Sequence, residues 1–178
     1  INSKIIALKE NIKEFELLEI IEANNINNEV DGILVQLPLP NHINSNKIID
    51  SINIKKDVDG FHSMNIGLLA IGRPNVIPCT PFGCYKMLES ITTLEGKSVI
   101  VIGRSNIVGK PLAYLLTNSN ATVTLAHSKT KGLKEFCKKS DILVAAMGKS
   151  NFIKKDWVKK SAIVIDVGIN IIENDEGK

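Results

Sequence analysis

Cysteine, aromatic residues and long apolar runs are all scarce in this chain of 178 residues. The cysteines Cys79, Cys84 and Cys137 form no C-x-x-C pair and lie near no pair of histidines. This spacing argues against a zinc site and a disulfide framework, and it is typical of a reducing compartment. No apolar run approaches the ~18 residues of a membrane span, and no signal peptide is visible. We therefore expect a cytoplasmic protein with no membrane partner.

The chain also lacks a strong excess of charge of one sign. Its 22 basic and 19 acidic residues give a net charge of +3, and the lysines are scattered among Asn and Glu. Without a basic stripe, nucleic acid is not an expected partner. The hydrophobic content of 44% can fill the core of one or two lobes. Because the chain begins at Ile1 and ends in a turn-like run, 174–178, we expect it to be part of a longer protein.

The most informative stretch is 97–111, where the apolar run Ser98–Ile102 breaks into a Gly- and Ser-containing turn and then a helical pattern. A strand, turn and helix in this order can bind an anion, because N–H groups at a helix start lack intrahelical partners and the helix dipole is positive there. Gly103 fills the first glycine position of the dinucleotide fingerprint, whereas Ser105 and Val108 stand at the second and third. On this stretch alone, a packing helix without a ligand is an equally weighted interpretation.

The second half of the chain alternates regularly between strand and helix patterns. Apolar runs predict strands at 98–102, 121–126, 142–146 and 162–167, and helical spacing predicts helices at 112–116 and 133–138. Continuous apolar strands separated by helices indicate a parallel sheet covered on both faces, as in a Rossmann-like lobe.

The first half predicts a smaller α/β lobe. Helical spacing indicates helices at 14–23 and 45–52, and the run 33–35 between turn residues indicates a buried strand. A further helix should begin near Thr80 as N-cap, with Pro81 at its first position. We place the boundary there, which predicts an α/β protein of two lobes, 1–80 and 81–178.

The end of the second predicted strand favours NADP over NAD. An NAD site has an acidic residue there that binds the ribose 2′-hydroxyl. This strand instead ends in His127-Ser128-Lys129-Thr130, which contains no carboxylate. Arg104, Ser128 and Lys129 could receive a 2′-phosphate at this position. We assign no catalytic role to His127.

Polar residues in the first half suggest a second binding site. Gln36 stands at the carboxyl end of the 33–35 run, where ligands bind in α/β sheets, although glutamine there more often satisfies loop backbone. Asp57 and Asp59 are one residue apart and point the same way on an extended segment, which suits a ligand with several N–H donors. No carboxylate or histidine cluster completes a metal shell, so we expect no metal. From the pattern alone, however, the favoured alternative is an Asp-Gly turn in which Asp57 pairs with a lysine.

These segments together resemble the bifunctional methylene-tetrahydrofolate dehydrogenase/methenyl-tetrahydrofolate cyclohydrolase enzymes of the FolD type. The matching segments come in family order and cover nearly the whole chain: 32–40, 56–61, Asn65 with Gly67, 78–81, 103–105 with 108–111, 121–124 with 127–128, and 166–170. The resemblance implies a folate-binding catalytic lobe followed by an NADP-binding lobe. The complete enzyme would oxidise the methylene bridge by hydride transfer and hydrolyse the methenyl product to the formyl form.

For the folate site, the resemblance implies roles for Val35, Gln36, Leu37 and Asp59. The first three would line the folate cleft, with the Gln36 amide close to the catalytic centre. Asp59 would accept hydrogen bonds from the amino group and ring N–H of the pterin, a paired donor that a carboxylate matches.

For the cofactor site, the resemblance implies that Gly103, Arg104 and Ser105 hold NADP. Ser128 would help to bind the 2′-phosphate, and the backbone at Ile169 would lie near the nicotinamide. A homodimer through the cofactor lobe is implied in the same way.

Two family elements are not in the sequence, and one of them is a Pro-Gly-Gly-Val-Gly-Pro loop downstream of the position of Lys178. Enzymes of this type carry a Tyr-x-x-x-Lys helix upstream of the position of Ile1, and its lysine moves the proton in the cyclohydrolase step. Lys4, Lys9 and Lys13 have no tyrosine four residues before them and are not substitutes. We therefore expect activity of the complete protein only. A non-catalytic nucleotide-binding module and an unrelated two-lobe NADP dehydrogenase of the shikimate type are the alternatives.

Overall fold

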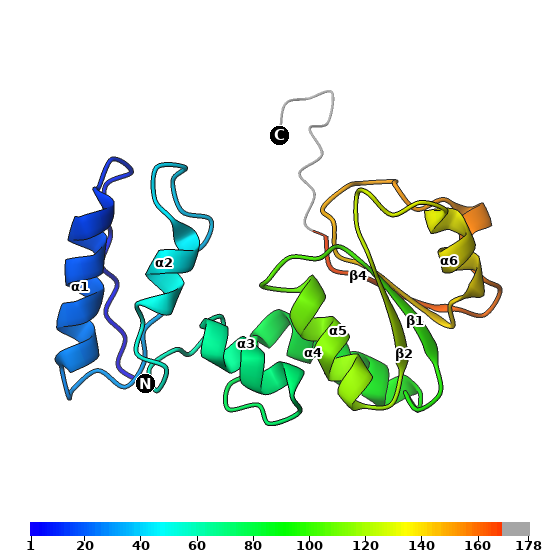
Figure 1. Cartoon of the computed structure of the whole chain (residues 1–178), viewed down its shortest axis with the longest axis horizontal. Coiled ribbons are helices and arrows are strands. Elements are labelled where there is room, and N and C mark those ends of the chain that lie inside the picture. The colour runs from blue at the N-terminus through cyan, green and yellow to red at the C-terminus, as the bar shows by residue number, and fades with distance from the viewer. Residues whose placement is uncertain (169–178) are drawn as a thin grey trace.

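The computed structural model describes residues 1–168, and its elements fall into two groups (Figure 1). Helices α1 (Glu14–Ile26) and α2 (Ser45–Asp50) form the first lobe. Helix α3 (Ser63–Ala70) follows, and the remaining elements build the second lobe around a parallel sheet. None of the described helices is long and apolar enough to cross a membrane.

The second lobe contains the predicted parallel sheet. Its strands are β1 (Ser98–Ile102), β2 (Thr122–Ala126), β3 (Ile142–Ala145) and β4 (Ile163–Asp166), in the spatial order β2-β1-β3-β4. Chain order reverses at β1, which pairs with β2 on one side and β3 on the other. In open α/β sheets, ligands bind outside the carboxyl ends of the strands at such a switch point.

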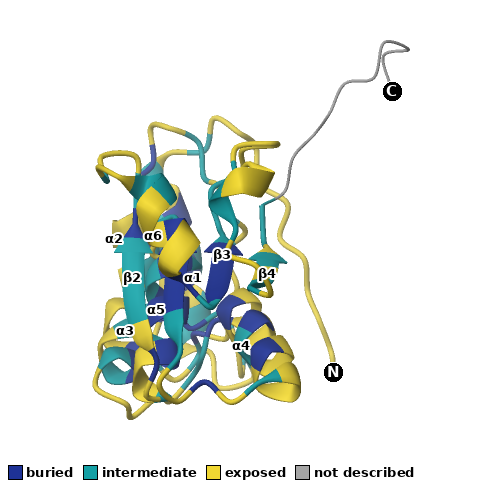
Figure 2. Ribbon diagram, turned by 90° about the vertical axis from the view of Figure 1, so that its right-hand side faces the viewer, coloured by how far each residue is buried: buried dark blue, intermediate teal, exposed yellow. Residues whose placement is uncertain are grey.

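Helices cover both faces of this sheet, as the sequence predicts. Val99 and Val101 of β1 share a core with residues of α4 (Cys79–Ile91) and α5 (Gly109–Asn118). Ile100 and Ile102 share a second core with residues of α6 (Leu133–Lys139) and the 3₁₀ helix η1 (Lys155–Trp157). Alternate side chains of β1 therefore enter opposite cores, and Val99–Ile102 are fully buried. Figure 2 shows that β3 is buried as well.

The first lobe packs α1 against α2 through aliphatic side chains. Leu17 and Ile21 of α1 belong to the same core as Ile48 of α2. The carboxyl end of α1 is capped from outside the helix, because Lys56 Nζ donates to the carbonyls of Asn24, Asn25 and Asn27 at 2.9, 2.7 and 2.7 Å. The predicted helix at 14–23 is confirmed and extends to Ile26, whereas the one at 45–52 ends at Asp50.

The predicted buried strand at 33–35 is wrong. Only Ile33 forms a bridge, with Asp57, and Leu34 is 56% exposed. The Ile33 N–H donates to the Lys56 carbonyl at 2.7 Å, but within residues 1–168 no segment pairs with the other side of this run. A ladder with one partner and one bridge is too short to make a strand.

Two helix predictions also need correction. Helix α4 begins at Cys79 after Pro78, so Thr80 is not the N-cap and Pro81 lies further inside the first turn, where its missing N–H is still tolerated. Helix α3 was not predicted from the sequence. It contacts α5, and Asn118 Nδ2 donates to the Leu69 carbonyl at 2.8 Å. The division at residue 80 stays a prediction.

Candidate functional site

Two residues that are predicted to bind a phosphate group follow the carboxyl ends of β1 and β2, at one edge of the sheet. Ile102 pairs with Ala126, and the Gly103 N–H donates to the Ala126 carbonyl at 2.9 Å. Because neighbouring strands are about 4.8 Å apart, the segments that follow them emerge side by side. Arg104 and Ser128 lie in these two segments, and both are exposed to solvent.

Two glycines allow the close approach of backbone at this edge. Gly103 has φ +126°, and a Cβ there would lie 2.2 Å from the Ala146 carbonyl oxygen after β3. A Cβ on Gly109, the first residue of α5, would lie 2.0 Å from the Gly103 carbonyl oxygen. Gly109 was not among the predicted site residues, because the spacing of the fingerprint places Val108 at its third position. A glycine opening the helix, one residue later, was the available signal.

Ser105, which precedes α5, accepts hydrogen bonds at the start of that helix. Its Oγ accepts from the N–H groups of Val108 and Gly109 at 3.1 and 3.2 Å, and its carbonyl accepts from the Lys110 N–H at 3.0 Å. Pro111 has no N–H group. The N–H groups of Gly109 and Lys110 thus have no intrahelical partner, as expected, but both donate to Ser105 outside the helix. Within the described chain, the Arg104 guanidinium forms no ion pair.

The segment after β2 is a tight turn that presents Ser128. The His127 N–H donates to Thr130 Oγ1 at 2.9 Å, and the Thr130 N–H donates to the His127 carbonyl at the same distance. The ring Nδ1 of His127 accepts from the Lys129 N–H at 3.2 Å. These bonds give His127 a structural role in the turn and leave Ser128 exposed at its tip.

In the first lobe, Asp57, Asp59 and Val35 line one small cavity. The cavity measures about 10 Å³ and is also lined by apolar side chains of Ile33, Ile49, Ile52 and Phe61. This is the space of roughly one water molecule, so the cavity is too small to enclose an aromatic ring. Burial, and then the neighbouring Asp57 charge, raise the pKa of Asp59 above its ordinary value.

Asp57 is buried and accepts hydrogen bonds on both of its oxygens. The N–H groups of Gly60 and His62 donate to it at 3.0 Å each, and Asn65 Nδ2 donates at 2.7 Å. None of these donors is a lysine, so the alternative of a lysine partner is wrong. Asn65 Oδ1 is buried without a donor in the described part of the chain. The Asp57 carboxylate fixes the orientation of the Asn65 amide, because a flipped amide would place the Asn65 oxygen, an acceptor, against the carboxylate oxygen.

Gln36 and Leu37 continue directly from Val35, but Gln36 does not contact the acidic cavity. Its side chain is exposed, and Nε2 donates to the Leu37 carbonyl at 3.0 Å. This bond is the loop-satisfying role that the sequence analysis gave as the alternative. Leu37 is half-buried.

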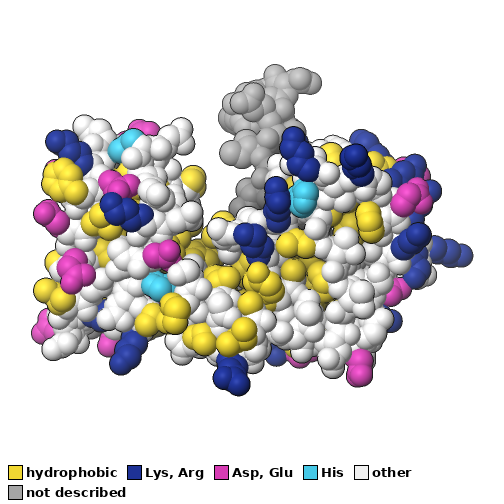
Figure 3. Space-filling view, viewed as in Figure 1, with side chains coloured by type: hydrophobic (Ala, Val, Ile, Leu, Met, Phe, Trp, Pro, Cys, Tyr) yellow, Lys and Arg dark blue, Asp and Glu magenta, His cyan; other side chains and the backbone are white. Residues whose placement is uncertain are grey.

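A groove separates the two lobes in the space-filling view, with Lys and Arg side chains on the second lobe where it borders the groove (Figure 3). In Figure 1 the β1–α5 connection, which contains Arg104, lies on the side of the second lobe turned toward α1 and α2. Of the predicted site residues, those in the β1–α5 connection therefore belong to a segment that borders this groove. Ile169 lies outside the described residues.

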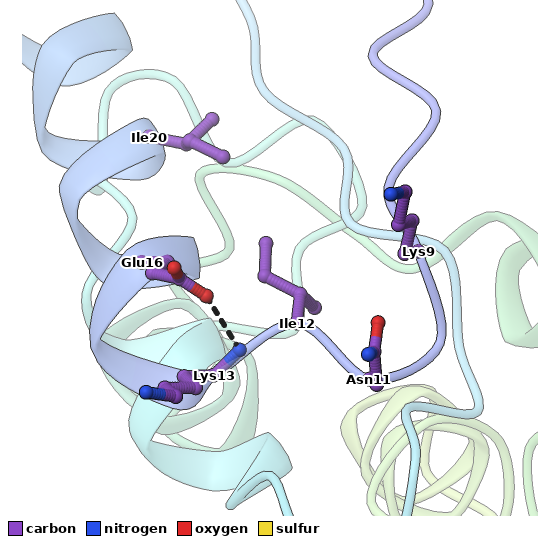
Figure 4. A pocket seen from close by; sticks show the side chains of 6 residues that line it. All are labelled: Lys9, Asn11, Ile12, Lys13, Glu16 and Ile20. Atoms are coloured by element: carbon purple, nitrogen blue, oxygen red, sulfur yellow. Dashed lines mark hydrogen bonds between the residues drawn. The ribbon is translucent and has the colours of Figure 1, made fainter.

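A separate hollow of about 510 Å³ lies against the start of α1 and contains none of the predicted site residues (Figure 4). It is lined by Lys9, Asn11, Ile12, Lys13, Glu16 and Ile20. Glu16 Oε2 accepts from the Lys13 N–H at 2.8 Å, and the Lys13 side chain points away from Ile12 and Ile20. The carboxylate is thus used to cap α1.

Comparison with known proteins agrees with this two-lobe arrangement. The family model for the tetrahydrofolate dehydrogenase/cyclohydrolase NAD(P)-binding domain matches residues 78–178, and the model for the catalytic domain matches residues 1–59. The chain belongs to the tetrahydrofolate dehydrogenase/cyclohydrolase family.

Individual family members match over nearly the whole chain. The bifunctional protein FolD of a Wolbachia strain from Drosophila simulans is 55% identical over 174 residues, which are 97% of this chain and 60% of that protein. The crystal structure of the Campylobacter jejuni bifunctional enzyme FolD superposes with a TM-score of 0.88 at 46% identity, covering 95% of this chain and 60% of that one. The Trypanosoma brucei enzyme, solved with NADP cofactor and inhibitor, has a TM-score of 0.87 at 35% identity, with coverages of 93% and 57%. The chain thus spans about three fifths of the length of these relatives.

Proposed function

We propose that the complete protein oxidises 5,10-methylenetetrahydrofolate with NADP⁺ and hydrolyses the 5,10-methenyl product to 10-formyltetrahydrofolate, in cytoplasmic one-carbon metabolism. The single observation that carries the choice of cofactor is the edge formed by β1 and β2, where exposed Arg104 and Ser128 emerge side by side. The turn after β2 contains no carboxylate to bind a ribose 2′-hydroxyl. A guanidinium and a hydroxyl at this position suit a 2′-phosphate.

Gly103, Gly109 and Ser105 support this proposal by shaping the turn that would hold the cofactor. The glycines bring β1, α5 and the segment after β3 close together, and Ser105 keeps the start of α5 folded back on that turn. Such a preformed turn can bind the diphosphate without a large ordering cost. A bound NADP⁺ would supply the hydride acceptor, and by family resemblance the backbone at Ile169 would lie near its nicotinamide.

On the folate side, we assign Asp59 to the pterin and Val35, Gln36 and Leu37 to the wall of the cleft. The Asp59 carboxylate can accept the paired N–H donors of the pterin edge and so orient the methylene carbon. Gln36 would exchange its bond to the Leu37 carbonyl for one to the bound folate near the reacting carbon. In the dehydrogenase step, hydride leaves the methylene carbon and a methenyl cation remains. Water then adds to this cation, and a proton is released as the ring opens to the formyl product.

The test is an assay of NADPH formation from methylenetetrahydrofolate by the complete protein, followed by measurement of 10-formyltetrahydrofolate. We expect turnover with NADP⁺ and a lower kcat/KM with NAD⁺. Turnover of shikimate in place of the folate would contradict the proposal. Binding of NADP⁺ without any turnover would identify a non-catalytic nucleotide-binding module instead.

We also propose that two copies pair through the cofactor lobe. This assignment rests on family resemblance, and sedimentation equilibrium of the complete protein tests it. A concentration-independent monomer mass would contradict it.

A further inference from the structure

We propose that Asp57 is a positioning residue for Asp59: it holds the turn that carries Asp59 and places a second negative charge at the same cavity. The substrate named for Asp59 rests on the proposed function, whereas the effect of Asp57 on Asp59 does not. Asp57 itself is 2% exposed, and the proposal includes no contact between Asp57 and substrate.

The carboxylate of Asp57 accepts hydrogen bonds from three groups that follow Asp59 in the chain. One oxygen accepts from Gly60, directly after Asp59, and the other accepts from His62 and from the Asn65 side chain of α3. The backbone before Asp59 is held separately, since Asp57 forms the bridge to Ile33. Asp59 therefore stands between two anchored points of the chain. The one before it is the backbone bridge, in which the Ile33 N–H donates to the Lys56 carbonyl, and the one after it is made by the Asp57 carboxylate.

Gly60 occupies a tight position in the turn, where a residue with a side chain would be strained. Its φ is +71°, and a Cβ there would lie 3.1 Å from the Val76 carbonyl oxygen and from the Pro78 nitrogen. The turn is thus pressed against the segment that leads into α4. If the Gly60 N–H lost its acceptor on Asp57, a buried donor would be left without a hydrogen bond. This would cost free energy of folding, and we expect the backbone of the turn to shift in response.

The charge of Asp57 acts on Asp59 across the cavity that both residues line. The other lining side chains, those of Ile33, Val35, Ile49, Ile52 and Phe61, are apolar, so no cation in the described lining compensates the pair. The donors to Asp57 are N–H groups, the partners that an ionised carboxylate takes. Burial first, and then the like charge of Asp57, raise the pKa of Asp59, whereas Asp57 has three N–H donors to its carboxylate.

Asp57→Asn tests the charge while keeping the side-chain shape. The Asp59 carboxyl carbon is titrated by NMR in the wild type, in Asp57→Asn and in the control Asp31→Asn. Asp31 is an exposed carboxylate close in sequence to the Ile33 bridge, but it does not line the cavity. We expect the Asp59 midpoint to move to lower pH in Asp57→Asn and to stay unchanged in Asp31→Asn.

Asn65→Ala separates positioning from charge, because it removes one donor and leaves the Asp57 carboxylate in place. In the complete protein we expect kcat/KM for methylenetetrahydrofolate to fall by up to about 10²-fold in Asp57→Asn, as for a misplacement of about 1 Å. We expect a smaller fall in Asn65→Ala. The acid limb of the kcat/KM profile should move to lower pH only in Asp57→Asn.

An unchanged Asp59 midpoint in folded Asp57→Asn overturns this inference whatever the enzyme's activity. If that variant does not fold, the wild-type titration decides: an Asp59 midpoint at or below that of an ordinary aspartate also overturns it. Absence of folate turnover in the wild type, with the Asp59 midpoint displaced as expected, contradicts the proposed function and supports the role of Asp57.

Discussion

Replacing Gly109 by alanine should damage both the stability of the second lobe and its binding of NADP. The new methyl carbon would lie 2.0 Å from the Gly103 carbonyl oxygen, 2.7 Å from its carbonyl carbon and 3.1 Å from Arg104 Cα. These are backbone atoms, so no side chain can rotate away. Ordinary van der Waals contact begins near 3.4 Å, and the start of α5 must therefore move by about 1.4 Å relative to the end of β1.

The free energy of unfolding follows from two opposing effects. Overpacking of this kind costs about 1–3 kcal/mol, whereas alanine in a helix recovers at most about 1 kcal/mol relative to glycine. We expect a net loss of about 1–2 kcal/mol, measured by urea unfolding. Because the methyl group also displaces the turn that carries Arg104, the Kd for NADP⁺ should rise by about 10-fold, measured by calorimetry.

Gly83→Ala is the matched control. Gly83 is an exposed glycine inside α4, and a Cβ there meets no atom within 4 Å. This change should stabilise the protein by about 0.5–1 kcal/mol and leave the Kd for NADP⁺ unchanged. If Gly109→Ala were as stable as wild type and bound NADP⁺ normally, the argument from backbone approach would be refuted.

Three further predictions concern the cofactor edge, the core and a surface ion pair. Arg104→Ala should weaken binding of NADP⁺ by about 1–3 kcal/mol and of NAD⁺ much less, and equal losses in calorimetry would refute the 2′-phosphate assignment. Leu116→Ala, at a fully buried position between α5 and the sheet, should lower the free energy of unfolding by about 2–5 kcal/mol, and a loss under 1 kcal/mol would contradict the packing. Lys159, and then the Ser98 N–H, lower the pKa of Asp141. Its contribution to stability is therefore present above the ordinary aspartate pKa and lost as pH falls through the lowered value, so Asp141→Asn should flatten this part of the unfolding profile.

The second lobe could be predicted well from sequence because its pattern is local. Ser98–Ile102 is a continuous apolar run that ends on glycine, and it forms β1 with the predicted bounds. Val99–Ile102 are fully buried on both faces of the sheet, so every residue in this run is apolar. A continuous apolar run therefore indicates a central strand. The missing carboxylate after β2 is likewise visible in the sequence, and it predicts the cofactor before any geometry is known.

The first lobe was harder to predict, because its short segments acquire structure from distant partners. The 33–35 run has strand composition, yet its state depends on which segments pair with it, and only the Ile33 bridge to Asp57 forms among residues 1–168. Asp57 and Asp59 look equivalent in the sequence. Their different burial and hydrogen bonds arise from the turn at Gly60 and from Asn65 on α3, which the pattern did not reveal.

The sequence by itself determined the parallel α/β class, the order of strands and helices along the second half, and which residues carry charge or phosphate-binding groups. Tertiary structure alone decided that Gly109 packs on Gly103, that Ser105 occupies the N–H groups at the start of α5, and that Asp57 is buried beneath the turn of Asp59. Apolar periodicity reports which faces are buried, and it operates within one element. Close backbone approach and hydrogen-bond partners depend on where different elements meet, and only the folded chain brings those elements together.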